Sequence, residues 1–384
     1  EMFELLFSAI LGRFYMWTRR GRRHGAMAQL LERLQEGNVS SGSWIPDSAG
    51  VRSARDRLLA WGLAERGGPG IRLSPKVSAE IVALFAGLID LYGPVLKPVA
   101  LKDCPIHFCT GLVRLPNPSN QAPNEARITI PAGGQGPDPA TAAISCLGEM
   151  AERISLFFEG EEDPRICSRN AQIEDVPLGP VLGFSARQER RLAERSQAVQ
   201  AAWRNDRIDW NALSDARVEI TNLRDGRHAQ IPAFAVLMGK REGMGGSVPR
   251  VASSSGTAVW SDREEATRRA LHELAERDAF GRAWYNRLGI TRVYREDWGT
   301  ILPENLANYL IARSRLACIV RVFCDFDVQV LAAVSWQKNG LGGCLGVAAA
   351  PSAADAAYSA VSEMLQAEIS LELSARAYEA DRRR

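Results

Sequence analysis

The first hundred residues combine short amphipathic helices with a glycine-rich hairpin. Apolar residues recur with helical spacing over residues 26–37 and again over 49–62, where they share one face of the second segment. A Gly-Gly-Pro-Gly turn separates two short strand-like segments within residues 62–74, and residues 77–93 predict a further helix. Helix, turn, helix and hairpin in this order predict a small winged-helix-like domain over residues 1–99.

From residue 100 onward, strand-like and helix-like segments alternate. Helical periodicity predicts helices over residues 141–160, 186–204, 264–287 and 352–381. Apolar and β-branched runs predict strands within residues 113–132, across an Asp-Gly hairpin turn in residues 216–238, and within residues 318–351. We therefore predict a mixed α/β (α+β) fold for a second domain, residues 100–384, with its helices packed against β-sheet.

Composition places the chain among ordinary globular proteins. Of its 384 residues, 46% are hydrophobic and 24% are charged, and the formal net charge is +2. This balance gives no bulk electrostatic attraction to nucleic acid or to a membrane surface. No apolar stretch predicts a transmembrane helix, and the apolar start precedes the basic run Arg19–Arg23, the reverse of the order in a signal peptide. We therefore expect a cytoplasmic protein.

Cysteine and histidine spacing does not favour disulfides or zinc. The seven cysteines include no Cys-x-x-Cys pair, and several lie in apolar surroundings, so we expect reduced, buried thiols. The four histidines have no metal-binding spacing.

Three of the predicted helices carry the same acidic pattern, in which a glutamate is followed three positions later by Glu or Gln. The pairs are Glu149 and Glu152, Glu273 and Glu276, and Glu363 and Gln366. Positions i and i+3 lie on one face of a helix, so each helix projects a pair of oxygen ligands in one direction.

The neighbours of these glutamates decide between two interpretations. The same spacing is common on solvated helices, where it forms weak surface ion pairs. The helices around Glu149 and Glu363 are otherwise largely apolar, and carboxylates on buried helices are costly without a cation or hydrogen bonds. Repetition of the pattern on apolar helices therefore favours a Mg²⁺ site, because Mg²⁺ prefers hard oxygen ligands and often bridges carboxylates to substrate phosphates.

Arginines and small residues accompany the acidic pattern. Arg153 and Arg277 each follow the second glutamate of their helix, either as ion-pair partners or as ligands of phosphate oxygens. Small residues precede the helices at 133–136, 253–256 and 342–343, where plain turns or the approach of backbone amides to phosphate would both explain them. No segment is a P-loop, because the Gly-Lys-Ser/Thr ending is absent.

Taken together, these residues resemble the signature of the YcaO family. The run from Gly134 to Arg153 resembles the family's GKG…SxxxExxER motif, and the run from Ser254 to Asp278 resembles its SNG…ExxERD motif. The third helix is similar to the family's ExxQ segment, and Thr110-Gly-Leu-Val resembles its TGIV segment. The resemblance covers roughly residues 100–384, with every motif in the family's order.

The resemblance implies a YcaO fold that binds ATP and Mg²⁺ through a glutamate-rich site. It implies ATP-dependent attack on a peptide backbone amide. In the commonest case a Cys, Ser or Thr side chain adds to the preceding carbonyl, the oxyanion takes phosphate from ATP, and loss of phosphate leaves a thiazoline or oxazoline. We therefore expect a cyclodehydratase that modifies a ribosomally made precursor peptide.

By motif position, the resemblance assigns roles to individual residues. The implied metal ligands are Glu149, Glu152, Glu273, Glu276 and Glu363, and Glu149, Glu152 and Glu276 are the implied catalytic residues. The residues implied to contact the nucleotide, or to hold the carboxylates, are Ser145, Arg153, Ser255, Arg277 and Gln366.

Four positions depart from the family pattern. Gln135 stands where Lys is usual, Ser255 where Asn is usual and Ser359 where Arg is usual, and Glu368 replaces a common Arg. Cationic groups around phosphates contribute strongly to phosphoryl transfer. The departures therefore favour metal binding more firmly than productive ATP turnover.

Other activities fit the same residues. A YcaO enzyme can form a thioamide with external sulfide or an amidine with an internal amine. A chain with altered phosphate ligands can also be a non-catalytic scaffold that binds a peptide or a partner protein.

The resemblance also implies partners. They are a precursor (leader) peptide, an E1-like or leader-binding protein, a dehydrogenase of the same pathway and a second copy in a homodimer. Residues 1–99 fit three roles: binding the leader peptide as an added edge strand, general docking or dimerisation, and DNA binding through Arg19–Arg23. Nucleic acid is the least favoured of these partners, and membrane association is not expected.

Overall fold

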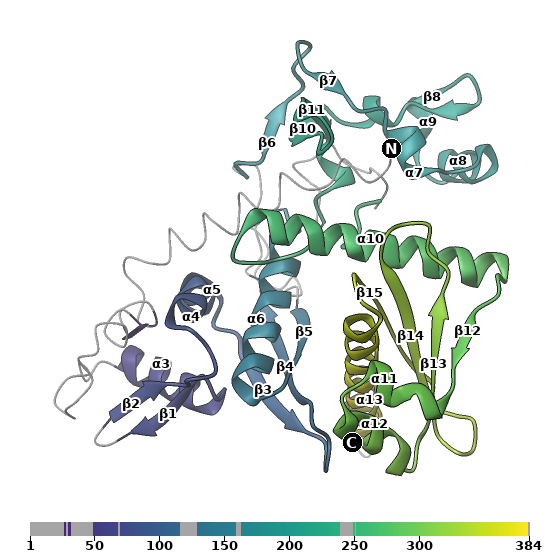
Figure 1. Ribbon diagram of the computed structural model, residues 1–384. Helices are drawn as coiled ribbons and strands as arrows, with labels where there is room; N and C mark the ends of the chain where they lie inside the picture. The colour runs from purple at the N-terminus through teal and green to yellow at the C-terminus, as the bar shows by residue number, and fades with distance from the viewer. Residues whose placement is uncertain are drawn as a thin grey trace. The chain divides into compact units, whose positions relative to one another are not determined.

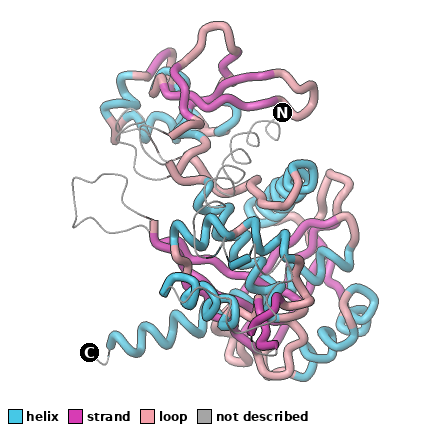
Figure 2. The backbone as a smooth tube through the Cα atoms, turned by 90° about the vertical axis from the view of Figure 1, so that its left-hand side faces the viewer, coloured by secondary structure: helices cyan, strands magenta, loops and turns pink. Residues whose placement is uncertain are grey.

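The computed structural model describes residues 27, 30–31, 49–67, 70–115, 129–158, 163–238, 249 and 251–382. The chain divides into two compact units. The larger unit contains residues 18–113, 131–150 and 260–384, and the smaller unit contains residues 1–17, 114–130 and 151–259. Both units mix helices and strands, as Figure 2 shows, which confirms the predicted α/β class.

The N-terminal part of the larger unit contains short helices and a hairpin. Helix α3 (Ala49–Ala60) precedes β1 (Ala64–Gly67), which pairs antiparallel with β2 (Gly70–Leu73) across the predicted glycine-rich turn. The single helix predicted next is split into α4 (Ala79–Leu84) and α5 (Ala86–Tyr92), with Phe85 between them. Most of the first predicted helix lies outside the described residues. The winged-helix domain and its boundary at residue 99 therefore stay predictions.

Two sheets and the Glu-bearing helices make up the rest of the larger unit. The three-stranded sheet has the order β3 (Val95–Ala100), β4 (His107–Arg114), β5 (Thr129–Gly136). The four-stranded antiparallel sheet has the order β12 (Thr291–Val293), β13 (Leu316–Val322), β14 (Gln329–Trp336), β15 (Cys344–Ala350). The helices are α6 (Pro139–Ser155), α10 (Arg263–Asn286), α11 (Trp298–Ile301), α12 (Glu304–Ala312) and α13 (Ala353–Arg382), with the short 3₁₀ helix η4 (Arg295–Asp297).

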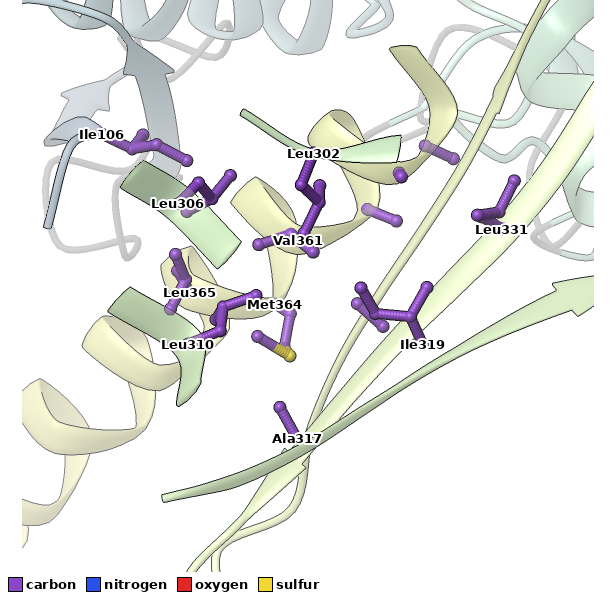
Figure 3. Packing of buried hydrophobic residues seen from close by; sticks show 14 of the residues in the cluster. Ile106, Leu302, Leu306, Leu310, Ala317, Ile319, Leu331, Val361, Met364 and Leu365 are labelled. Atoms are coloured by element: carbon purple, nitrogen blue, oxygen red, sulfur yellow. The ribbon is translucent and has the colours of Figure 1, made fainter. Parts of the chain in front are cut away.

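Each face of the four-stranded sheet is covered by a different Glu-bearing helix (Figure 1). Side chains alternate between the two faces of a strand, so Ile319 and Leu331 pack toward α13, whereas Val320 and Val330 pack toward Ala279 of α10. The α13 face forms the main core, where Met364 meets the strands together with residues of α11 and α12 (Figure 3). The apolar run predicted at 318–336 is thus two strands that are buried on both faces.

The smaller unit is built on a four-stranded sheet of order β6 (Ile166–Ser168), β10 (Ala216–Thr221), β11 (His228–Pro232), β7 (Glu174–Asp175). Strands β10 and β11 form the predicted hairpin, and Gly226 adopts the positive φ of 73° that its turn requires. The remaining elements are α7 (Leu178–Leu182), α8 (Ala186–Ala193), α9 (Gln197–Ala201), the hairpin of β8 (Trp203–Arg204) and β9 (Arg207–Ile208), η2 (Trp210–Leu213) and η3 (Ala233–Ala235).

One predicted helix of the smaller unit is divided. Residues 186–204 form α8 and α9 rather than a single helix. The reason is local, because the Ser196 side chain accepts a hydrogen bond from the Val199 N–H and so begins a second helix inside the periodic segment. In neither unit does a helix of the described residues combine the length and the apolar character needed to cross a membrane.

Candidate active site

Helix α6 lies directly against strand β5, and this close approach orients Glu149. The carboxylate of Asp138 caps the start of α6 by accepting two backbone N–H groups, each at 3.0 Å. A Cβ atom at Gly134 would collide with the backbone of α6 at Ala142, so a residue without a side chain is required there. The neighbouring Gly133 N–H donates to Glu149 Oε2 at 2.6 Å. A strand amide therefore holds the first predicted metal ligand.

Helix α13 and strand β15 repeat the same arrangement for Glu363. A Cβ atom at Gly346 would collide with the backbone of α13 at Ala360. The next residue of the strand, Val347, donates its N–H to Glu363 Oε2 at 3.2 Å. In both places a glycine lets helix and strand backbones touch, and an adjacent strand amide binds a helix glutamate.

Glu276 of α10 approaches the same strand from the other face of the sheet. Its carboxylate accepts a hydrogen bond from the backbone N–H of Ala349, two residues beyond Val347. Strand β15 is the edge of its sheet, and N–H groups two residues apart leave a strand on the same side. The open edge of β15 thus presents adjacent amides to two glutamates that come from different helices.

The pKa values of these two carboxyl groups are raised. Burial and then the charge of Glu363 raise the pKa of Glu276 to about 8, against the lowering effect of Arg277 and the Ala349 hydrogen bond. Desolvation by surrounding protein raises the pKa of Glu363 to about 7, and Glu273 and Glu149 add to the increase. Glu276 is only 8% exposed, whereas Glu363 is exposed to solvent, which moderates its desolvation.

Arg277 and Glu273 complete the charged residues of this region. Arg277 lies 3.4 Å from Glu273 Oε1 and 3.7 Å from Glu276 Oε1, and its side chain is 61% exposed. We refer to Glu149, Glu273, Glu276 and Glu363 as the acidic cluster. Arg277 lowers the pKa of both Glu276 and Glu363, opposite to the effect of the neighbouring carboxylates.

Two predicted nucleotide contacts belong to the same unit. The amide group of Gln366 on α13 lies over Gly133, where an added Cβ would collide with Gln366 Nε2. Gln366 therefore adjoins the strand residue whose N–H holds Glu149. Ser145 lies one helical turn before Glu149 on α6 and is exposed.

Glu152, Arg153 and Ser255 belong to the smaller unit. The buried Thr257 hydroxyl has a single proton, which it can donate either to Glu152 Oε1 at 3.1 Å or to the Ser254 carbonyl at 2.6 Å. Thr257 carries no sequence signal for this role, because it is 105 positions from Glu152 in the chain. The structure therefore adds one residue that holds a predicted ligand.

The donor chemistry of the acidic cluster fits a divalent cation. Within the described ranges, no three His, Cys, Asp or Glu side chains lie close enough to form a metal-binding group. The acidic cluster nevertheless offers only carboxylate oxygens, the ligands that Mg²⁺ prefers. Glu363 and Glu273 raise the pKa of Glu276, and Glu273 and Glu149 raise the pKa of Glu363, and a cation beside these carboxylates would offset that repulsion.

One departure from the family pattern has a clear structural account. Glu368 of α13 forms ion pairs with Arg313 at 3.0 Å and with Arg315 at 3.3 Å. The negative charge at this position is therefore matched by arginines that follow α12. Gln135 and Ser359 are partly buried.

A protein-family model matches most of the residues of the larger unit. Residues 133–384 match the family model described as YcaO cyclodehydratase, ATP- and Mg²⁺-binding, which is well over half of the chain. The matched region includes α6, α10 and α13 with the whole acidic cluster. A comparison with curated proteins found no match.

Two solved structures share the fold at low sequence identity, and a third aligns with a TM-score just under 0.5. A heterocyclase in complex with substrate and cofactor aligns with a TM-score of 0.52 and 21% identity, covering 73% of this chain and 38% of that chain. The E. coli microcin synthetase McbBCD complex aligns with a TM-score of 0.50 and 16% identity, covering 72% and 64%. YcaO from Methanopyrus kandleri bound with AMPPCP and Mg²⁺ aligns with a TM-score of 0.49 and 17% identity, covering 72% and 63%. This chain thus spans less than two thirds of the length of each.

Proposed function

We propose that this chain, which belongs to the YcaO family, uses ATP and Mg²⁺ to activate a backbone amide of a peptide, forming a thiazoline or oxazoline from Cys, Ser or Thr. The observation that carries the proposal is the pair formed by Glu276 and Glu363. These glutamates come from different helices and accept hydrogen bonds from backbone N–H groups on one edge of the same strand. The pKa values of both carboxyl groups are raised, so their ionised forms are destabilised. Such an arrangement is costly unless a cation is part of the working site.

The residues of the chain would divide the work between holding metal and holding nucleotide. Glu149, Glu273, Glu276 and Glu363, with Glu152 from the end of α6, are the proposed Mg²⁺ ligands. Arg153, Arg277, Ser145, Ser255 and Gln366 are the proposed contacts to the nucleotide. When bound, Mg²⁺ neutralises phosphate charge and ATP supplies the phosphoryl group that turns an amide oxygen into a leaving group.

Orientation is the contribution that the fold makes. Backbone amides of Gly133 and Val347 fix the directions of Glu149 and Glu363, so neither carboxylate has to be ordered when a ligand binds. Glu276 is enclosed and therefore acts in a region of low dielectric, where interactions with a cation are strong. The exposed guanidinium of Arg277 is free to turn toward a phosphate group at little cost.

Calorimetry with the full chain, ATP and Mg²⁺ tests the proposal at its base. We expect nucleotide binding that depends on Mg²⁺, and we expect Glu276→Gln to weaken the affinity at least roughly 100-fold. This loss exceeds the one typical of residues that only orient the metal ligands. Glu264→Gln is the matched control, because Glu264 is an exposed glutamate in the first turn of the same helix. Equal affinities for both variants would overturn the assignment of the metal site.

Intact-mass measurement of a Cys- and Ser-rich precursor peptide then tests the reaction. With ATP, Mg²⁺ and the partner proteins of the pathway, we expect the loss of one water for each ring formed. Replacement of oxygen by sulfur would instead identify thioamide formation, and condensation with an amine would identify an amidine. We propose that the reaction takes place in the cytoplasm, on a leader-bearing peptide, in a homodimer assisted by a leader-binding protein and a dehydrogenase.

A non-catalytic scaffold is the second candidate, and the residues at the departing positions favour it. Gln135, Ser255 and Ser359 lack the groups usual at those positions of the family, and so reduce the donors available to phosphates. A scaffold would bind the peptide without Mg²⁺-dependent nucleotide binding. The calorimetric experiment therefore separates the two candidates.

A further inference from the structure

Large apolar side chains are exposed together at one corner of the four-stranded sheet, and we call them the aromatic surface. The chain passes there from the end of α10 into β12, the outer strand of that sheet (Figure 1). The surface lies on the last turn of α10, on the segment after it and on the loop after β13, and consists of Trp284, Tyr285, Leu288, Ile290, Phe323 and Phe326. Trp284 is 70% exposed and Phe323 is 68% exposed.

Two contacts hold α10 and the loop after β13 side by side. Arg282 forms an ion pair with Asp325 at 2.5 Å, so the loop that carries both exposed phenylalanines is tied to the helix. The ring of Trp284 stacks on Phe280 with 6.2 Å between centroids, and Phe280 packs against the core that contains Val322. The exposed rings are therefore carried by a helix and a sheet that are packed together.

The segment between α10 and β12 is held in the same place. Arg287 ends α10 with a positive φ of 53°, and the Leu288 N–H donates to the Ala283 carbonyl at 3.0 Å. Thr291 then pairs with Arg321, which brings the start of β12 beside the end of β13. The three segments of the aromatic surface therefore meet at one corner of the sheet.

The exposed apolar area is large for a chain on its own. At about 200 Å² for a whole aromatic side chain, the four rings expose roughly 500 Å². The largest apolar patch of a typical monomer has about 300–600 Å², and each partner in a standard interface buries about 800 Å². Leu288, Ile290 and a polar rim extend the area toward that size. Trp and Tyr are also the residue types that contribute most binding energy at interfaces.

Charged residues of both signs surround the aromatic surface. They are Arg287, Arg292, Arg295, Glu296, Asp297 and Asp327, all of which are exposed. In the part of the chain that the structure describes, none of these six forms an ion pair. A two-fold contact places a surface against its own copy, so a rim of one sign would repel that copy. Three positive and three negative charges instead allow the arginines of one copy to meet the carboxylates of the other.

We propose that the aromatic surface binds the same surface of a second copy of this chain across a two-fold axis. The apolar side chains form the middle of the contact, and the six charged residues form its rim. The inference rests on the proposed function in one respect, that the chain works as a homodimer, and it names the surface of that homodimer. The contact involves α10 about 12 Å along the helix from Glu276.

Light scattering after size-exclusion chromatography of the full chain, over a wide range of concentration, tests the proposal. We expect the mass of two chains. Trp284→Glu brings two carboxylates into the middle of the contact, one from each copy, and is expected to raise the Kd of the dimer at least roughly 100-fold. Trp260→Glu is the matched control, because Trp260 is also exposed but lies before α10, and it should leave the dimer unchanged.

Three results would overturn the proposal. They are the mass of one chain for the unmodified protein at every concentration, a mass that keeps rising with concentration, and a dimer that Trp284→Glu leaves intact. A rising mass would mean an open, head-to-tail contact in place of a two-fold one. Phe323→Glu provides a second variant should Trp284→Glu fail to fold, and a dimer that survives it would also refute the assignment.

Calorimetry with ATP and Mg²⁺ on the same samples separates this inference from the proposed function. A single chain that binds nucleotide would refute the aromatic surface as a dimer contact and leave the proposed function standing. A dimer that Trp284→Glu dissociates, but that binds no nucleotide, would support the surface and contradict the proposed function.

Discussion

Helix α13 contributes to two charged regions of opposite sign. In the acidic cluster, neighbouring carboxylates raise the pKa of Glu276 and Glu363. In the second region, which we call the basic cluster, the two guanidinium groups of Arg313 and Arg315 pair with the one carboxylate of Glu368. Carboxyl groups respond to crowding by retaining protons, and the pKa of Glu276 accordingly rises to about 8. A guanidinium cannot respond in this way, because it stays charged at every pH that a protein tolerates. The carboxyl groups of Glu276 and Glu363 can therefore reduce their charge by retaining protons, whereas Arg313 and Arg315 depend on Glu368 for charge compensation at every pH.

The largest expected effect is at the basic cluster. Glu368→Ala removes the one carboxylate that, among the described residues, lies within ion-pair distance of Arg313 and Arg315, and is expected to lower the free energy of unfolding by about 3–5 kcal/mol. Urea unfolding measures the change. Glu372→Ala is the matched control on the same helix, where an exposed pair with Arg376 is worth about 0–1 kcal/mol. Similar losses in the two variants would show that the basic cluster is not enclosed in solution.

The next effect has the opposite sign and lies in the acidic cluster. The pKa of Glu276 is about 8 when folded, against 4.5 for an ordinary glutamate, so the folded chain binds more protons between these values. The contribution of Glu276 to stability therefore falls as the pH rises from 4.5 to 8. Glu276→Gln removes this cost and should stabilise the Mg²⁺-free chain by roughly 2–4 kcal/mol at pH 8, with little difference near pH 5.

Unfolding in urea at several pH values, with a chelator present, measures this difference. Glu264→Gln should leave the pH dependence unchanged, because Glu264 is exposed. An equal loss of stability at both pH values would contradict the raised pKa of Glu276, because it would show that the ionised carboxylate is stabilised in the folded chain.

A smaller effect is expected from Mg²⁺ itself. Binding requires ionised carboxylates, so Mg²⁺ competes with the protons on Glu276. At concentrations 10- to 100-fold above its Kd, Mg²⁺ should stabilise the chain by about 1–3 kcal/mol at pH 8 and by less at pH 6. Thermal unfolding with MgCl₂, against KCl of equal ionic strength, measures the shift. A shift that does not depend on pH would separate metal binding from these carboxyl groups.

Much of the acidic cluster could be predicted before its geometry was known. Glutamates spaced by three on apolar helices are visible in the local pattern, and α6, α10 and α13 occur within a few residues of their predicted positions. Interruptions by local capping were harder to predict. Ser196 divides one predicted helix, although the periodicity continues through it.

The partners of these residues could not be predicted in the same way. Glu149 is held by an amide 16 positions away, and Glu368 pairs with Arg313 across 55 positions. Thr257 reaches Glu152 across 105 positions. Periodicity reports which residues share a face of one element, but it carries no information about which elements meet.

By itself, the sequence determined the mixed α/β class, the helices that carry the glutamates and the membership of the YcaO family. These depend on residue order over a few helical turns, which the chain carries locally. Only the tertiary structure decided that Glu276 and Glu363 share one strand edge, and that Glu368 lies between two arginines. The physical reason is that burial and Coulomb interactions depend on distances in space, and these are set when α10 and α13 close on opposite faces of the same sheet.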